Sequence, residues 1–126
     1  MIILRNKYKE IPYNSENVNK YKSSNNLLRH AKTDKDVSGI MLIDKNTEDL
    51  IGYCAWKNDY IIALEVLENY KGNGFGDILL EKAIKSGCNK LSVSKKNTVA
   101  LNLYKKHKFI TSRNINDKVI EMELEL

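Results

Sequence analysis

Three glycines stand at every second position in the stretch Tyr70-Lys-Gly-Asn-Gly-Phe-Gly-Asp77, near the middle of the chain. They are half of the protein's six glycines, and they separate an apolar, strand-like run from a helix-like run. A glycine-rich turn before a helix leaves backbone N–H groups free and directs them, with the positive end of the helix dipole, at one point. Phosphate groups bind at such points, so we expect this segment to hold a phosphate-bearing ligand.

Two common glycine motifs fit this segment poorly. A Walker A loop ends in Gly-Lys-Ser/Thr, whereas this segment ends in Gly76-Asp77. A dinucleotide-binding fingerprint requires Gly-x-Gly-x-x-Gly and an acidic residue about 20 positions later. Here the third glycine comes one residue early, and no acidic residue lies in that window. An ordinary strand-to-helix turn is the remaining alternative, but such a turn does not require three alternating glycines.

The chain has a net charge of +5, and its basic residues are unevenly distributed. No acidic residue lies between Glu81 and Asp117. The nine basic residues in that interval are Lys82, Lys85, Lys90, Lys95, Lys96, Lys105, Lys106, Lys108 and Arg113. Such a tract is typical of a surface that binds polyanions, but lysines that only keep helix faces hydrated give the same pattern. Charge alone leaves both interpretations open.

Length and composition indicate one globular domain. At 126 residues, 42% of them hydrophobic, the chain can bury a single core. Charges at Arg5 and Lys7 interrupt the apolar N-terminal residues, and no apolar run reaches the roughly 18 residues that a membrane span needs. We therefore expect an intracellular, cytoplasmic protein without a membrane segment. Cys54 and Cys88 have no metal-ligand spacing, so we expect free thiols and no bound metal.

Hydrophobic periodicity and turn residues predict a mixed α/β sheet domain. The expected strands are residues 1–8, 39–44, 50–56, 60–67, 90–94, 108–115 and 118–126. The expected helices are two short ones within 13–33, capped by Ser15 and by Ser23 or Ser24, and then 76–87 and 98–107, the last capped by Asn97. The element order is therefore β-α-α-β-β-β-α-β-α-β-β, an α+β mixed sheet with antiparallel hairpins and crossover helices.

The glycine segment and the last helix resemble two sequence blocks of the GNAT family of N-acetyltransferases. The first block is Arg/Gln-x-x-Gly-x-Gly/Ala at a strand-to-helix junction, and residues 71–76 match both glycines, with Lys71 in place of Arg or Gln. Residues 97–109, "NTVALNLYKKHKF", resemble the second block, Asn-x-x-Ala-x-x-Leu-Tyr-x-x-x-Gly-Phe. Lys108 stands where glycine is usual, so we expect it to adopt left-handed backbone. Residues 1–36 resemble the family in element order only.

The resemblance implies the GNAT fold and a single acyl-CoA N-acyltransferase domain over residues 1–126. It implies an enzyme that transfers an acetyl group directly from its cosubstrate, acetyl-CoA, to a primary amine of a protein, peptide or small molecule. The expected partner is that amine acceptor, with no membrane partner and with nucleic acid disfavoured. The expected assembly is a monomer or a homodimer.

The resemblance also implies where the cosubstrate binds. Backbone N–H groups of residues 71–76 would bind the diphosphate of coenzyme A, and the basic tract would favour its 3′-phosphate. The strands at 62–66 and 91–94 would diverge to admit the pantetheine arm, which would pair with the backbone of residues 64 and 66. The N–H of Val66 or its neighbour would face the thioester carbonyl. The residues expected to bind the cosubstrate are Leu64, Val66, Lys71, Gly72, Asn73, Gly74, Phe75, Gly76 and Asn97.

Tyr104 would be the general acid that protonates the departing thiolate. A phenol of reference pKa near 10 is a suitable donor for a thiolate whose conjugate acid lies near 8.5. The general base stays open, because the position at which the family often has a glutamate is Tyr60 here. We expect a water relayed to Tyr60, Asp59 or Glu65. Strand alternation places Glu65 on the face opposite Leu64 unless a bulge intervenes.

Two other functions compete with acetyl transfer. The first is a nucleic-acid-binding domain that uses the basic tract, but residues 82–116 contain only Tyr104 and Phe109 as aromatic stacking platforms. The second is a non-catalytic coenzyme A sensor of the same fold. For such a sensor, Tyr104→Phe would leave the biological activity unchanged.

Overall fold

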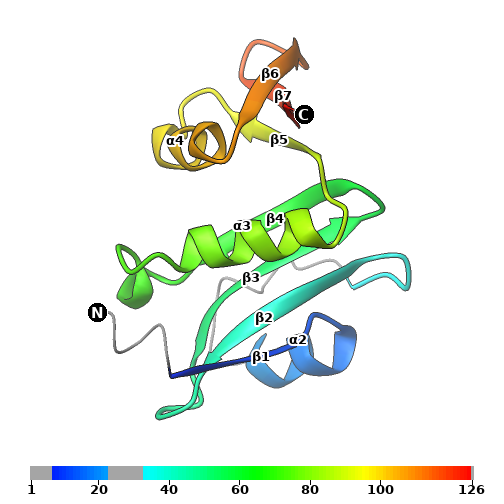
Figure 1. Cartoon of the computed structure of the whole chain (residues 1–126). Helices are drawn as coiled ribbons and strands as arrows, with labels where there is room; N and C mark the ends of the chain where they lie inside the picture. The colour runs from blue at the N-terminus through cyan, green and yellow to red at the C-terminus, as the bar shows by residue number, and fades with distance from the viewer. Residues whose placement is uncertain (1–6, 23–32, 126) are drawn as a thin grey trace.

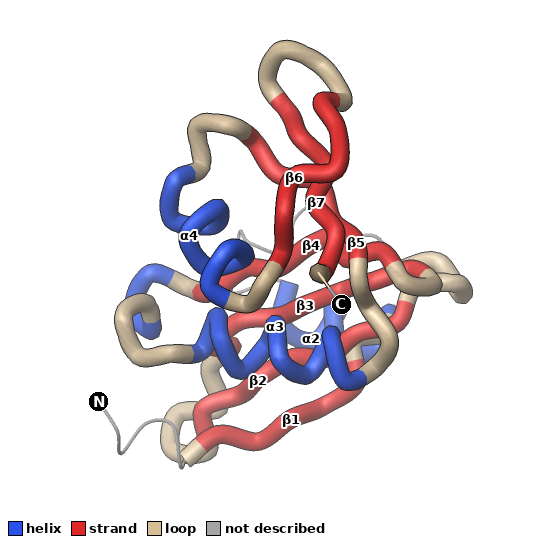
Figure 2. The backbone as a smooth tube through the Cα atoms, turned by 45° about the horizontal axis from the view of Figure 1, so that its top comes forward, coloured by secondary structure: helices blue, strands red, loops and turns tan. Residues whose placement is uncertain are grey.

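The computed structural model describes residues 7–22 and 33–125, which form a seven-stranded mixed sheet with helices on both faces (Figure 1, Figure 2). The strands are β1 (Tyr8–Pro12), β2 (Ser38–Asp44), β3 (Leu50–Lys57), β4 (Tyr60–Val66), β5 (Lys90–Ser94), β6 (Phe109–Asn114) and β7 (Val119–Leu124). The helices are α2 (Ser15–Lys22), the short 3-10 helix η2 (Glu68–Tyr70), α3 (Phe75–Lys85) and α4 (Thr98–Lys106). The strand order is β1-β2-β3-β4-β5-β7-β6, with only β4 and β5 parallel. The predicted α/β mixed sheet is confirmed.

An apolar core lies on each face of the sheet, because the middle strands are buried on both sides. Leu42 of β2 belongs to the same cluster as Leu79 of α3, whereas its neighbour Met41 belongs to a cluster with Val18 of α2. Successive strand side chains point to opposite faces, which explains this division. Full burial of one such side chain contributes about 1.5–3 kcal/mol to stability. Strands β2, β3 and β4 therefore form the centre of the fold, and β5, β7 and β6 continue the sheet beyond β4.

The first two elements differ from the prediction. The first strand is Tyr8–Pro12 rather than residues 1–8, and residues 1–6 lie outside the described part. Proline fits there because β1 is an edge strand and proline has no N–H for a ladder. Asn14, not Ser15, caps α2, since its Oδ1 accepts the N–H of Asn17 at 2.8 Å. The second predicted helix, with Ser23 or Ser24 as its cap, also lies outside the described residues.

The helix ends follow the sequence more closely. Helix α3 runs from Phe75 to Lys85, one residue earlier at its start and two earlier at its end than predicted. Helix α4 has the predicted cap, since Asn97 Oδ1 accepts the N–H of Ala100 at 3.1 Å. Lys108 adopts the expected left-handed backbone, with φ of 71°. The 3-10 helix η2 was not predicted, and none of the helices in the described ranges is long and apolar enough to cross a bilayer.

Strands β4 and β5 separate soon after they meet. Their parallel ladder consists of two pairs, Tyr60 with Lys90 and Ile61 with Leu91, beyond which the strands diverge (Figure 1). A register shift against β3 leaves Ile62 as an extra residue at the same place. A bulge of this kind bends a strand and changes which side chains share a face. The bulge therefore coincides with the start of the divergence.

Candidate active site

The glycine loop between η2 and α3 contains two residues with left-handed backbone. Gly72 has φ of 79°, and Gly74, the N-cap of α3, has φ of 85°. An L-residue pays roughly 1–2 kcal/mol in this region, whereas glycine does not. A Cβ at Gly72 would meet no atom within 4 Å, so its surroundings on this side are open. The loop therefore presents bare backbone immediately before the amino end of α3.

The third glycine has a different role. Gly76 lies inside α3, and a Cβ there would lie 3.3 Å from Leu103 Cδ2 of α4. That distance is tighter than ordinary contact, so Gly76 allows the two helices to approach each other. Gly76 also lines the cleft beside the loop, and its predicted contact with the cosubstrate stays a prediction. Two glycines shape the turn, and the third sets the spacing of α3 and α4.

The side chains of the loop are held at its beginning. Asn73 Nδ2 donates to the carbonyl of Tyr70 at 3.1 Å and to that of Lys71 at 3.2 Å. Lys71 Nζ lies 3.4 Å from Glu68 Oε2, and the lysine side chain is 61% exposed. An ion pair this exposed contributes little to stability, so the ammonium group can exchange it for an anionic ligand.

A cleft of about 460 Å³ opens beside the loop. It is lined by Leu64, Glu65, Val66, Tyr70, Lys71, Gly72, Gly74, Phe75, Gly76, Asp77, Asn97, Val99, Ala100, Leu103 and Tyr104. A smaller hollow of about 220 Å³ lies between β4 and β5, where the strands diverge. The residues common to both are Leu64, Glu65, Asn97, Ala100 and Tyr104. The two hollows therefore adjoin, and one elongated ligand can occupy both.

Tyr104 lies where the two hollows meet. Its side chain is buried, with 7% exposure, and its ring stands 6.1 Å from that of Phe109 at 61°. Burial, together with the nearby Cys54 and Glu65, raises the pKa of Tyr104 to about 12. The phenol is therefore protonated throughout the range in which enzymes work, as a proton donor must be.

The structure distinguishes among the three candidate bases, Glu65, Tyr60 and Asp59. Glu65 lines both hollows with Tyr104, whereas Tyr60 and Asp59 line neither. Tyr60 Oη donates instead to Glu121 Oε2 at 3.2 Å, and burial raises the pKa of this tyrosine. Asp59 pairs with Lys90 at 3.9 Å. Of the three, only Glu65 shares a hollow with the proposed acid.

Two residues that line this cleft, Tyr70 and Asp77, were not predicted from the sequence. Asp77 Oδ1 lies 2.7 Å from His107 Nε2 and 2.9 Å from Lys106 Nζ, so it joins the start of α3 to the end of α4. Burial opposes its ionisation, but the hydrogen bonds from His107 and Lys106 hold the pKa of Asp77 below its usual value. Asp77 and His107 are 30 positions apart in the chain, and no sequence signal indicates this contact.

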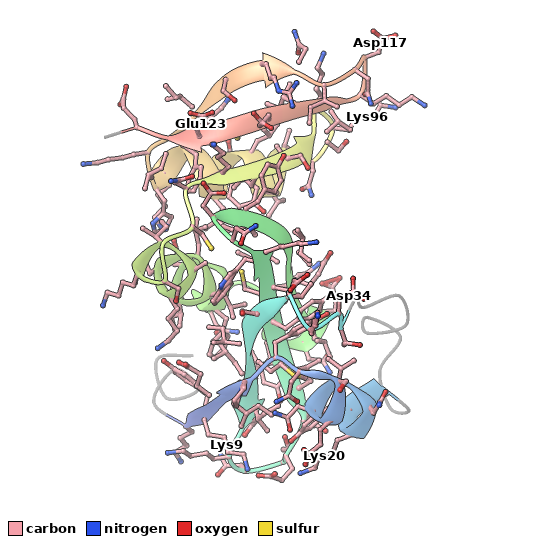
Figure 3. The ribbon with its side chains drawn as sticks, turned by 90° about the vertical axis from the view of Figure 1, so that its right-hand side faces the viewer. Lys9, Lys20, Asp34, Lys96, Asp117 and Glu123 are labelled. Atoms are coloured by element: carbon pink, nitrogen blue, oxygen red, sulfur yellow. The ribbon has the colours of Figure 1, made fainter. Side chains whose placement is uncertain are left out.

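Four members of the basic tract are ion-paired, which weakens the polyanion interpretation. The pairs are Lys82–Glu10, Lys90–Asp59, Lys106–Asp77 and Arg113–Glu121. Basic side chains also lie at both ends of the molecule, with Lys96 near Asp117 at one end and Lys9 and Lys20 at the other (Figure 3). Within residues 7–22 and 33–125, no group of three or more His, Cys, Asp or Glu side chains is placed to hold a metal ion.

Comparison with known proteins relates this arrangement to one family. A family model described as the Acetyltransferase (GNAT) family matches residues 3–109. Among curated proteins, no significant match was found.

Solved structures with the same fold include several acetyltransferases. Arabidopsis thaliana Naa50, in complex with the bisubstrate analogue CoA-Ac-MVNAL, superposes with a TM-score of 0.73 at 18% identity, over 95% of this chain and 99% of that one. Arabidopsis thaliana NAA60 with acetyl-CoA gives 0.71 at 16% identity, over 94% and 99%. The ribosomal-protein-S18-alanine N-acetyltransferase of Escherichia coli gives 0.69 at 17% identity, over 93% and 92%. At these identities the likeness shows a shared fold.

Proposed function

Because the chain belongs to the GNAT acetyltransferase family and is an acetyl-CoA-dependent N-acetyltransferase, we propose that it acetylates a primary amine of a protein, a peptide or a small molecule. The acetyl group passes directly from the thioester to the amine. The observation that carries the proposal is the early end of the β4–β5 ladder after two residue pairs, with the glycine loop and Tyr104 beside the opening.

The loop and the amino end of α3 supply the seat for the diphosphate of acetyl-CoA. Gly72 and Gly74 leave the backbone of this turn uncovered at two positions, and the first N–H groups of a helix have no partner within the helix. These groups and the helix dipole favour a bound anion. Lys71 adds a positive charge to the lining of the cleft, and Asn97 also lines it.

The edge of β4 that faces β5 supplies backbone partners for the pantetheine arm. Leu64 and Val66 pair with β3 on one side, but the ladder with β5 has already ended at Ile61. Their groups on the β5 side are therefore available to an extended ligand, as they are in strand addition. An N–H at or near Val66 would also stabilise the oxyanion that develops on the thioester carbonyl.

Tyr104 and Glu65 supply the proton transfers. The amine nitrogen attacks the acetyl carbonyl and loses a proton, which a water held by Glu65 accepts. When the carbon–sulfur bond breaks, Tyr104 donates its phenolic proton to the thiolate. The products are the acetylated amine and coenzyme A, and solvent restores both protein groups to their starting state.

The class of acceptor is supported only by similarity. The Escherichia coli neighbour is named for an alanine of ribosomal protein S18, and the Naa50 neighbour was solved with an analogue carrying a peptide. A nourseothricin acetyltransferase also shares the fold, with a TM-score of 0.56 at 20% identity over 73% of this chain and 66% of that one. Both peptides and small molecules therefore belong in an acceptor screen.

Acetyl-CoA is expected to raise the melting temperature selectively. A ligand at 100 times its Kd stabilises the folded state by about 2.7 kcal/mol, which for a domain of this size is a rise in Tm on the order of 10 °C. Thermal unfolding measured with acetyl-CoA, coenzyme A, ATP and NAD tests this. Equal shifts with all four, or none with acetyl-CoA and coenzyme A, would count against the proposal.

The pH profile of kcat is expected to lack a falling limb from Tyr104. With its pKa raised to about 12, the phenol stays protonated at neutral and moderately alkaline pH. The rate should rise with pH as the acceptor system loses its proton, and then level off up to about pH 10. A fall below that pH that disappears in Tyr104→Phe would contradict the assignment.

A further inference from the structure

Asp44, at the end of β2, is the one charged residue that is buried in the described part of the chain, with 5% exposure. Burying a carboxylate is costly unless hydrogen bonds compensate it. Asp44 Oδ1 accepts the N–H of Asn46 at 2.8 Å, and Oδ2 accepts the hydroxyl of Tyr70 at 2.8 Å. Its second oxygen therefore reaches a residue 26 positions away, at the entrance of the glycine loop.

The β2–β3 turn does not require the contact with Tyr70. Backbone hydrogen bonds already close this turn, from the N–H of Asp44 to the carbonyl of Asp49 and from the N–H of Glu48 to the carbonyl of Asp44, each at 2.9 Å. The Oδ1 contact with Asn46 belongs to the same turn. The Oδ2 contact instead leaves the hairpin and joins it to η2.

Tyr70 contacts residues at both ends of the loop. Its carbonyl accepts the Asn73 amide at the start of the loop. Its ring stands edge-on to Phe75, the first residue of α3, at 6.2 Å and 79°. Phe75 is held from its other side by Tyr8, whose ring lies at 5.9 Å and 88°. Residues 71–74 therefore lie between Tyr70 and Phe75, whose rings are in contact, and Tyr70 also binds Asn73 within the loop.

We propose that Asp44 is a positioning residue for acetyl-CoA, which acts through Tyr70 to hold residues 71–74 in the conformation that binds the diphosphate. This inference rests on the proposed function of the loop. Asp44 itself lines neither hollow, whereas Tyr70 lines the larger one. The buried carboxylate thus fixes the direction of the Tyr70 ring, while the backbone of residues 71–74 contacts the ligand.

The test is the affinity of Tyr70→Phe for two ligands that differ in the diphosphate. This variant keeps the ring and removes the hydroxyl, a hydrogen bond to a charged group, so we expect acetyl-CoA binding to weaken by about 5- to 20-fold. Binding of S-acetylpantetheine, which lacks the diphosphate and nucleoside, should stay within about twofold of wild type, because β4 and Tyr104 are untouched. Calorimetry measures the first affinity and an NMR titration the second.

Asp44→Ala provides the second arm. The double variant should bind acetyl-CoA no more weakly than the weaker single variant, since each single variant already removes the Asp44–Tyr70 hydrogen bond. Glu48→Gln is the matched control: Glu48 lies in the same turn, and the substitution removes only its exposed ion pair with Lys9 of β1, so it should change neither affinity. A lower Tm for Tyr70→Phe with unchanged acetyl-CoA affinity, or equal losses for both ligands, would overturn the inference. Failure of the wild-type protein to bind acetyl-CoA would instead overturn the proposed function.

Discussion

Gly74→Glu is expected to abolish acetyl-CoA binding. Gly74 is the N-cap of α3, has φ of 85° and lines the larger hollow. A glutamate there puts a carboxylate against the N–H groups that would otherwise bind the diphosphate, and it repels the ligand's own charge. The left-handed backbone adds a strain of roughly 1–2 kcal/mol. Calorimetry with acetyl-CoA should detect no binding at concentrations that saturate the wild-type protein.

Strain and charge can be separated with a second glycine. Gly87 lies just beyond the other end of α3, also has left-handed backbone, with φ of 102°, and has open space where a Cβ would stand. Gly87→Glu should therefore lower Tm comparably while acetyl-CoA binds normally. Gly74→Ala carries the strain without the charge and should bind acetyl-CoA weakly. Wild-type affinity in Gly74→Glu would remove the loop from the binding site.

Tyr104→Phe is expected to lower kcat by about 10²- to 10³-fold, which is typical of the loss of a general acid. The affinity for acetyl-CoA should change little, because the ring stays in its buried position against Phe109. Release of the coenzyme A thiol, measured with an amine found in a library screen, gives the rate. Tyr60→Phe is the matched control, since that hydroxyl lies outside both hollows and contacts Glu121.

The same experiment separates an enzyme from a sensor. If Tyr104→Phe acetylates the acceptor as fast as the wild-type protein, Tyr104 is an ordinary buried aromatic residue. If the wild-type protein binds acetyl-CoA but acetylates no amine in a library of peptides and small molecules, the non-catalytic alternative is favoured. In that case the cleft would serve only to bind the ligand.

Local patterns in the sequence predicted the parts of the site that are contiguous in the chain. The alternating glycines located the turn before α3, and Asn97 was correctly placed as the cap of α4. The alternation in residues 120–126 gave the buried face of β7, where Ile120 and Met122 are in the core. These features depend on neighbours within a few residues, so a single sequence reveals them.

Features that depend on tertiary contacts were missed. The Asp44–Tyr70 and Asp77–His107 contacts join residues 26 and 30 positions apart, and neither pair has a distinctive spacing. The close approach of Gly76 to Leu103 on a later helix was also not predicted. The choice among the three candidate bases also required the fold, because only the arrangement of the strands shows that Glu65 lines the same hollows as Tyr104 while Tyr60 and Asp59 do not.

The most direct test of the account is a crystal structure of the protein with acetyl-CoA at saturating concentration. We expect the diphosphate oxygens within hydrogen-bonding distance of backbone N–H groups in residues 71–76, and the pantetheine arm between β4 and β5 beyond Ile61 and Leu91. Acetyl-CoA bound elsewhere, or a glycine loop filled by the protein's own atoms, would contradict it.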